Sequence, residues 1–105
     1  MIEKNEKICG VILSGGKSRR MAGKDKAFLQ IGRKVLLERV LENLGKQVDI
    51  LAINTNSDDN NYRRYGLPIL KDAVSGYLGP LAGLLTSMLW AKKIGYNHVV
   101  TVAVD

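Results

Sequence analysis

Glycine and cationic side chains gather in one short stretch near the N-terminus, the residues 13–21 with the sequence LSGGKSRRM. The cations that follow one another between positions 17 and 26 are Lys17, Arg19, Arg20, Lys24 and Lys26. Glycine lets backbone N–H groups approach phosphate oxygens, and Lys and Arg neutralise phosphate charge. Because no aromatic residue interleaves with these cations, the stretch predicts a compact anion site and not a nucleic-acid surface. A solvated basic loop without a ligand is the alternative for such a run of charge.

The spacing of this glycine loop excludes two familiar nucleotide motifs. A Walker loop reads G-x-x-x-x-G-K-[ST], and Gly16-Lys17-Ser18 supplies only its end, since Val11 stands where the leading glycine belongs and Gly10 lies one position too early. The dinucleotide fingerprint G-x-G-x-x-G does not occur. The loop can still bind phosphate through a motif other than these two.

Bulk properties bound the remaining possibilities. The chain has 105 residues, 46% hydrophobic and 25% charged, which describes a globular protein of at most one domain. The net charge of +6 is compatible with nucleic acid, an anionic membrane surface or a small polyanionic substrate, and the clustering of the cations near the glycines favours the last. The single Cys9 excludes an internal disulfide and reads as a buried strand residue. The charged N-terminus has no apolar signal core and no apolar run approaches the roughly 20 residues that span a bilayer, so we expect a cytoplasmic protein without a membrane partner.

Apolar runs and helical periodicities alternate along the chain. Buried strands are predicted at 8–14, 49–55 and 98–104, with a brief strand-like segment at 67–72 near a sheet edge. Residues 15–25 read as a long loop, and a short helix is predicted at 60–65. The first long helix presents Leu37, Val40, Leu41 and Leu44 and ends with Gly45 in the C′ position.

A second long helix begins at Gly79-Pro80 and is closed by Gly95, and its apolar face is predicted to consist of Leu81, Leu84, Leu85, Met88 and Leu89. This alternation predicts a parallel sheet wound by right-handed crossovers, with ligands at the carboxyl ends of the strands. The polar residues at these ends, which we expect to face one crevice, are Ser14, Gly15, Asn54, Asp72 and Asp105. Asn54 and Asp72 could instead simply cap turns.

The extended pattern L-x-G-G-x-S-x-R-M-x-G-x-D-K, from Leu13 to Lys26, resembles the molybdenum cofactor guanylyltransferases of the MobA type, as does Gly79-Pro80-Leu81-Ala82-Gly83 downstream. The resemblance implies a three-layer, Rossmann-like nucleotidyltransferase fold with a mostly parallel sheet, apparently truncated, of which residues 1–105 are the GTP-binding N-terminal part. The implied reaction transfers GMP from GTP to the molybdenum–molybdopterin cofactor and needs Mg²⁺. The missing half is expected to supply much of the pterin side.

The resemblance also assigns roles to individual residues. The implied GTP-binding residues are Leu13, Ser14, Gly15, Gly16, Arg20, Gly23, Lys26, Asn54, Asp72, Gly79 and Gly83. Arg20 and Lys26 would offset charge on the phosphates, and Asp105 would hold Mg²⁺. The sequence departs from the family pattern at Ala22, where a glycine is usual, and at Ala103-Val104, which replace a Pro-Cys pair.

Two other functions remain open at this point. The chain could be a nucleotide-binding fragment without turnover, or a related cytidylyl or sugar-phosphate nucleotidyltransferase, because both would share the loop. No nucleic-acid partner is expected. The final strand could leave an exposed sheet edge through which the chain self-associates.

Overall fold

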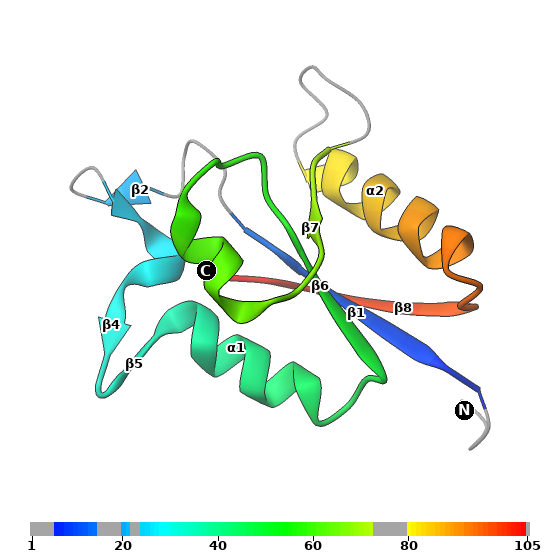
Figure 1. The fold of residues 1–105 in the computed structure, drawn as a ribbon, viewed down its shortest axis with the longest axis horizontal. Coiled ribbons are helices and arrows are strands. Elements are labelled where there is room, and N and C mark those ends of the chain that lie inside the picture. The colour runs from blue at the N-terminus through cyan, green and yellow to red at the C-terminus, as the bar shows by residue number, and fades with distance from the viewer. Residues whose placement is uncertain (1–5, 15–19, 22–23, 73–79, 105) are drawn as a thin grey trace.

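A computed structural model describes the backbone of residues 6–14, 20–21, 24–72 and 80–104, and the side chains of residues 6–14, 27–72 and 81–104. A four-stranded parallel sheet forms its centre, with the strand order β7-β6-β1-β8 (Figure 1). These strands are β1 (Ile8–Leu13), β6 (Ile50–Asn54), β7 (Ile69–Leu70) and β8 (His98–Ala103). The predicted parallel sheet is confirmed, and β7 lies at an edge as expected.

The two long helices, α1 (Leu36–Gly45) and α2 (Pro80–Lys93), cover opposite faces of the sheet (Figure 1). A Cβ placed on Gly10 would lie 3.0 Å from Leu44 of α1, and one placed on Gly83 of α2 would lie 3.2 Å from Leu13. Since side chains alternate along a strand, Gly10 and Leu13 of β1 point to opposite faces. The fold therefore has three layers, as predicted.

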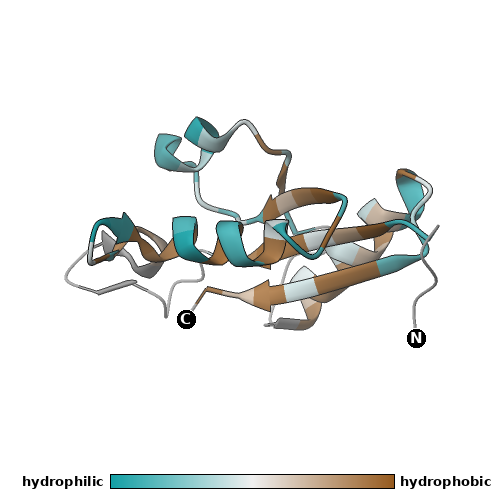
Figure 2. Cartoon of the chain, turned by 90° about the horizontal axis from the view of Figure 1, so that it is seen from below, coloured by the Kyte–Doolittle hydropathy of each residue, from teal (hydrophilic) through white to brown (hydrophobic). Residues whose placement is uncertain are grey.

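The main core lies between the sheet and α1. Its buried residues come from the central strands, from α1 and from the segments that connect them, and are Ile12, Ala27, Leu37, Leu44, Ile53, Tyr62 and Val104. Figure 2 shows the central strands largely hydrophobic along their length, as a sheet covered on both faces requires. Cys9 and Val11 are fully buried on the other face, which confirms the prediction for Cys9.

The apolar face predicted for α2 is not buried against the sheet, which corrects that prediction. Leu81, Met88 and Leu89 are between 50% and 64% exposed, and Leu84 and Leu85 are more than a third exposed. The helix instead buries small residues, which are Ala82, Gly83, Thr86, Ser87 and Ala91. The Thr86 hydroxyl donates to Ala82 O (2.8 Å) and the Ser87 hydroxyl to Gly83 O (2.7 Å), so both can be buried at no loss of hydrogen bonding. Small side chains allow the helix to approach the strands closely, and that contact decides which face turns inward.

The ends of the two helices differ from each other. Gly95, with φ +80°, closes α2 as predicted: its N–H donates to Lys92 O and the Tyr96 N–H donates to Ala91 O, the paired bonds of a Schellman motif. The prediction for Gly45 is wrong, because Gly45 is the last residue of α1 and the capping residue Lys46 has right-handed backbone angles.

Residues 20–35 contain short strands that the sequence did not reveal. Within the predicted loop, β2 (Arg20–Met21) and β3 (Lys24–Asp25) form a two-residue antiparallel ladder, followed by the 3₁₀ helix η2 (Lys26–Phe28). A second hairpin pairs β4 (Gln30–Ile31) with β5 (Lys34–Val35) and turns at Gly32, whose φ of +69° suits glycine. The short helix predicted at 60–65 is confirmed as the 3₁₀ helix η3 (Asn60–Tyr65). No helix in the described part of the chain is long and apolar enough to cross a membrane.

Candidate functional site

Polar residues from three chain segments meet at the carboxyl edge of the sheet. Ser14 follows β1 and donates its backbone N–H to Asn54 O, the last residue of β6, at 2.9 Å. Asn54 is in register with Leu70 at the end of β7, and Asp72 lies two residues further on. The structure therefore places Ser14, Asn54 and Asp72 at one edge of the sheet.

The Asn54 side chain is held in one orientation. Its Nδ2 donates to Leu70 O and to Asp72 Oδ1, both at 3.0 Å, so two acceptors fix the amide group. Asn54 is 6% exposed. Because Nδ2 faces β7, the amide oxygen Oδ1 points toward α2.

The Asp72 carboxylate binds both neighbouring asparagines. Oδ1 accepts from Asn54, and Oδ2 accepts from Asn56 Nδ2 at 2.8 Å. The Asp72 backbone N–H donates to Asn56 Oδ1 at 2.9 Å, which closes a reciprocal pair. Asp72 thus does more than cap a turn: it connects the loop after β6 with the end of β7. Asn56 was not predicted, although it lies in the same polar cluster two residues beyond Asn54.

Gly83 brings the first turns of α2 against Asn54. A Cβ at position 83 would lie 2.7 Å from Asn54 Oδ1, a distance that side chains do not tolerate. The absence of a side chain at this position allows the helix backbone and the Asn54 amide to lie together. The structure therefore places Gly83 beside Asn54 and Leu13, three of the residues that the sequence had grouped.

Ser14 is oriented differently from Asn54. Its hydroxyl shares a buried hydrogen bond of 2.8 Å with the Tyr62 hydroxyl, within the core on the α1 side. The Ser14 side chain therefore points into the protein interior, and only the Ser14 backbone leads on to the glycine loop. The contact between Tyr62 and Ser14 was not predicted from the sequence, because a tyrosine in a short polar helix carries no signal for its distant partner.

The remaining predicted residues are only partly described. The backbones of Arg20 in β2 and Lys26 in η2 are placed, without their side chains. Outside the described residues lie Gly15, Gly16, Gly23, Gly79 and Asp105. Among the described residues, no three His, Cys, Asp or Glu side chains are grouped as metal ligands would be. Val104, the last described residue, donates its N–H to Leu13 O at 3.1 Å and so lies at the same carboxyl edge.

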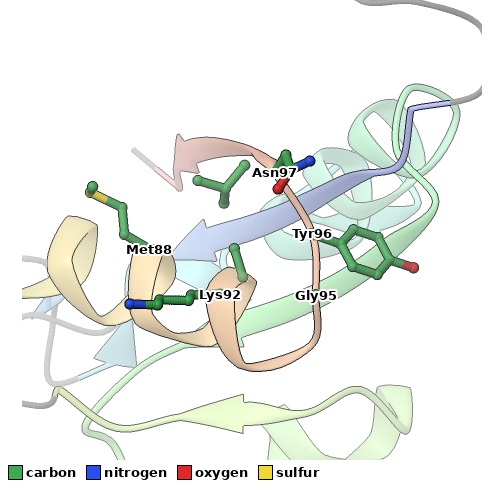
Figure 3. Close-up of a pocket in the computed structure, with 7 residues that line it drawn as sticks. Met88, Lys92, Gly95, Tyr96 and Asn97 are labelled. Carbon is green, nitrogen blue, oxygen red and sulfur yellow. The ribbon is translucent and has the colours of Figure 1, made fainter.

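A shallow hollow lies at the opposite end of the sheet (Figure 3). It is lined by the last turns of α2 and the turn into β8, including Met88, Lys92 and Tyr96. Because α2 runs away from the carboxyl edge, this hollow is remote from Asn54 and Gly83. It plays no part in the site.

Comparison with known proteins agrees with this arrangement. The profile of the MobA-like NTP transferase domain matches residues 10–105. A molybdenum cofactor guanylyltransferase of Mesorhizobium japonicum is 48% identical over 99 residues, covering 93% of this chain and 48% of that protein. Proteins of the same name from Cereibacter sphaeroides and Haemophilus influenzae are 43% and 41% identical, covering 94% and 82% of this chain and 50% and 45% of their own lengths.

The chain thus spans about half the length of the curated relatives it matches. The match nevertheless extends over the strands, both long helices and the polar strand ends described above. It identifies the fold as that of a nucleotidyltransferase domain and confirms the resemblance drawn from the glycine loop. The chain belongs to the MobA-like NTP transferase domain family.

Proposed function

We propose that this chain is the GTP-binding part of a cytoplasmic guanylyltransferase that transfers GMP to the molybdenum–molybdopterin cofactor. The observation that carries the proposal is the meeting of Asn54, Asp72 and Gly83 at the carboxyl edge of a parallel sheet, where Ser14 leads into a glycine- and cation-rich loop. Ligands of open α/β sheets bind at this edge. The names of the similar proteins support the choice of substrates.

The described residues suit recognition of a nucleotide. The fixed Asn54 amide presents its Oδ1 on the α2 side, where it can accept a hydrogen bond from a donor on the base or ribose. Asp72 holds that amide in place and adds negative charge, which favours ligand groups that donate hydrogen bonds. Gly15 and Gly16 would bring backbone N–H groups to the phosphates, and Leu13 would line the nucleotide site beside Gly83.

In the proposed reaction a terminal phosphate oxygen of the pterin cofactor attacks the α-phosphorus of GTP. A new phosphorus–oxygen bond forms, the bond to the β-phosphate oxygen breaks, and pyrophosphate leaves with the electron pair. Arg20 and Lys26 would offset the charge that builds on the α-phosphate and on pyrophosphate. Catalysis of this kind needs positioning and charge neutralisation and no side-chain nucleophile.

Asp105 would hold the Mg²⁺ ion that such a transfer requires. A carboxylate is the ligand type that Mg²⁺ prefers, and the Val104–Leu13 hydrogen bond brings the chain to the correct edge of the sheet. Asp72 is less suited to this role, because both of its carboxylate oxygens already accept amide hydrogens. When bound, Mg²⁺ would supply charge neutralisation at the phosphates.

Calorimetric titration with GTP, CTP and ATP tests the binding half of the proposal. We expect GTP to bind most tightly and Asn54→Asp to weaken it, since a carboxylate replaces the amide donor and faces Asp72. Asn43→Asp, an exposed asparagine on α1, is the matched control and should bind GTP like the unaltered chain. Tighter binding of CTP would overturn the guanine assignment in favour of a cytidylyltransferase.

Pyrophosphate release with GTP, Mg²⁺ and the pterin cofactor tests turnover by this chain. GTP binding without pyrophosphate release would assign the chain to the nucleotide-binding role alone.

A further inference from the structure

We infer that Tyr62 is a positioning residue that fixes both flanks of the glycine loop, Ser14 on one side and Phe28 on the other. The inference rests on the proposed function, because it assigns Tyr62 a role in holding the segment proposed to bind the phosphates of GTP. Tyr62 lies in η3, far along the chain from either flank, and nothing in its local sequence marks it for this role.

The first contact is polar. The Tyr62 and Ser14 hydroxyls share a hydrogen bond of 2.8 Å, and Tyr62 is 1% exposed. Ser14 is the last described residue before the glycines, and its backbone N–H is already bound to Asn54 O. Backbone and side chain of Ser14 are therefore both held at the point where the chain leaves β1.

The second contact is aromatic. The Tyr62 and Phe28 rings meet edge to face, with centroids 4.8 Å apart and an interplanar angle of 61°. Phe28 ends η2, the short helix that begins at Lys26, and Ala27 between them is buried. The ring of Tyr62 thus fixes the helix that carries Lys26, while its hydroxyl fixes Ser14.

Tyr62 is itself held firmly enough to act as such a support. The Asp59 side chain caps η3 by accepting from Asn61 N at 2.9 Å, and Gly66 ends the helix with φ +67°. One turn along, the Tyr65 hydroxyl lies 3.5 Å from Glu38 Oε1 on α1. The cap and the Gly66 turn fix the shape of η3, and the burial of Tyr62 in the main core holds the helix in place. The long Tyr65–Glu38 contact adds little to this.

A purely structural role would not require the hydroxyl. Phenylalanine would fill the same core volume and keep the contact with Phe28, without placing a polar atom in the interior. Burying a hydroxyl is unfavourable unless it is paired. Here the Tyr62 hydroxyl bonds to Ser14, the residue that precedes the glycines. The hydroxyl therefore indicates that Tyr62 positions Ser14 and does not only fill the core.

The test compares Tyr62→Phe, Ser14→Ala and their combination, with Tyr65→Phe as the matched control from the same helix. GTP affinity is measured by calorimetry at a temperature where circular dichroism shows every variant folded. We expect Tyr62→Phe and Ser14→Ala each to weaken GTP binding about three- to tenfold, the change that corresponds to one neutral hydrogen bond. The combined variant should bind like the single variants, because they remove the same bond. Tyr65→Phe should bind GTP like the unaltered chain. Unchanged affinity in folded Tyr62→Phe would overturn the inference and leave Tyr62 as a core residue.

Amide hydrogen exchange of the nucleotide-free chain gives a second readout that does not depend on GTP. We expect Tyr62→Phe, and not Tyr65→Phe, to accelerate exchange in residues 15–25. If the unaltered chain fails to bind GTP, the proposed function fails while this measurement still decides the inference. Equal exchange in both variants would refute it.

Discussion

Gly83 and Asn54 lie so close together that position 83 has no room for a side chain: a Cβ on Gly83 would come within 2.7 Å of Asn54 Oδ1. Asn54 cannot easily yield, because its Nδ2 is held by Leu70 O and Asp72. The contact therefore couples the start of α2 to the polar network at the ends of β6 and β7.

Gly83→Ala is expected to destabilise the fold and weaken GTP binding. Alanine favours a helix by about 1 kcal/mol over glycine, but displacing Asn54 breaks hydrogen bonds of a buried amide, which costs about 1–3 kcal/mol. Gly45→Ala is the matched helical control, since its Cβ would make only an ordinary 3.5 Å contact with Leu51. Urea unfolding should show a loss for Gly83→Ala and a gain for Gly45→Ala; equal gains would show that α2 can move away from Asn54.

Exchanging the partners at positions 56 and 72 tests the network itself. Asp72→Asn alone should lower stability and GTP affinity, because its new amide group faces the Asn56 amide group. Adding Asn56→Asp should restore much of the stability. The carboxylate introduced at position 56 would accept from the backbone N–H and the new side-chain amide at position 72, whose amide oxygen then remains for Asn54. Thermal unfolding of the single and double variants checks this expectation. A double variant no more stable than its weaker parent would contradict it.

Lys26→Ala should weaken GTP binding about tenfold, the effect expected for a charge-assisted hydrogen bond, and leave the melting temperature nearly unchanged. Lys34→Ala serves as the control, since Lys34 pairs with Glu42 on the surface. Titration at low and high salt should show a smaller salt dependence only for Lys26→Ala. A large drop in melting temperature would mean that Lys26 is structural.

Burial raises the pKa of the Cys9 thiol above its ordinary value. Above about pH 8.5 the unfolded chain therefore ionises this thiol while the folded chain retains its proton, so stability falls as pH rises through this range. We expect iodoacetamide to modify Cys9 only after unfolding, and Cys9→Ala to reduce the loss of stability between neutral and alkaline pH. Rapid modification of the folded chain would contradict the buried position.

We expect this chain to self-associate through a second copy. α2 exposes several leucines and a methionine, and in the described sheet β8 has one unpaired edge. Light scattering during gel filtration should show a mass that grows with concentration, and Leu81→Lys with Met88→Lys should reduce it. Ile31→Lys, which alters an exposed apolar residue of the β4–β5 hairpin, is the control. A monomer at all concentrations would disprove the expectation.

The sequence by itself determined the order of the strands and helices and the polar character of the strand ends. Unbroken apolar runs such as the one from Ile8 to Leu13 leave few structures other than strands covered on both faces, and Asn54 and Asp72 then fall at one edge by topology. Gly95 likewise revealed a helix end, because its positive φ suits glycine.

Tertiary structure alone decided which side of α2 faces the sheet and which partners the polar residues take. Large and small residues both recur at helical spacing in α2, and periodicity does not say which stripe turns inward. The stripe of small residues faces the sheet, because Gly83 allows the helix to pack closely against Asn54. The Thr86 and Ser87 hydroxyls bond to carbonyl oxygens of the helix itself and can therefore be buried. Tyr62 meets Ser14 across 48 residues for the same reason: packing determines a long-range partner, and no local pattern encodes it.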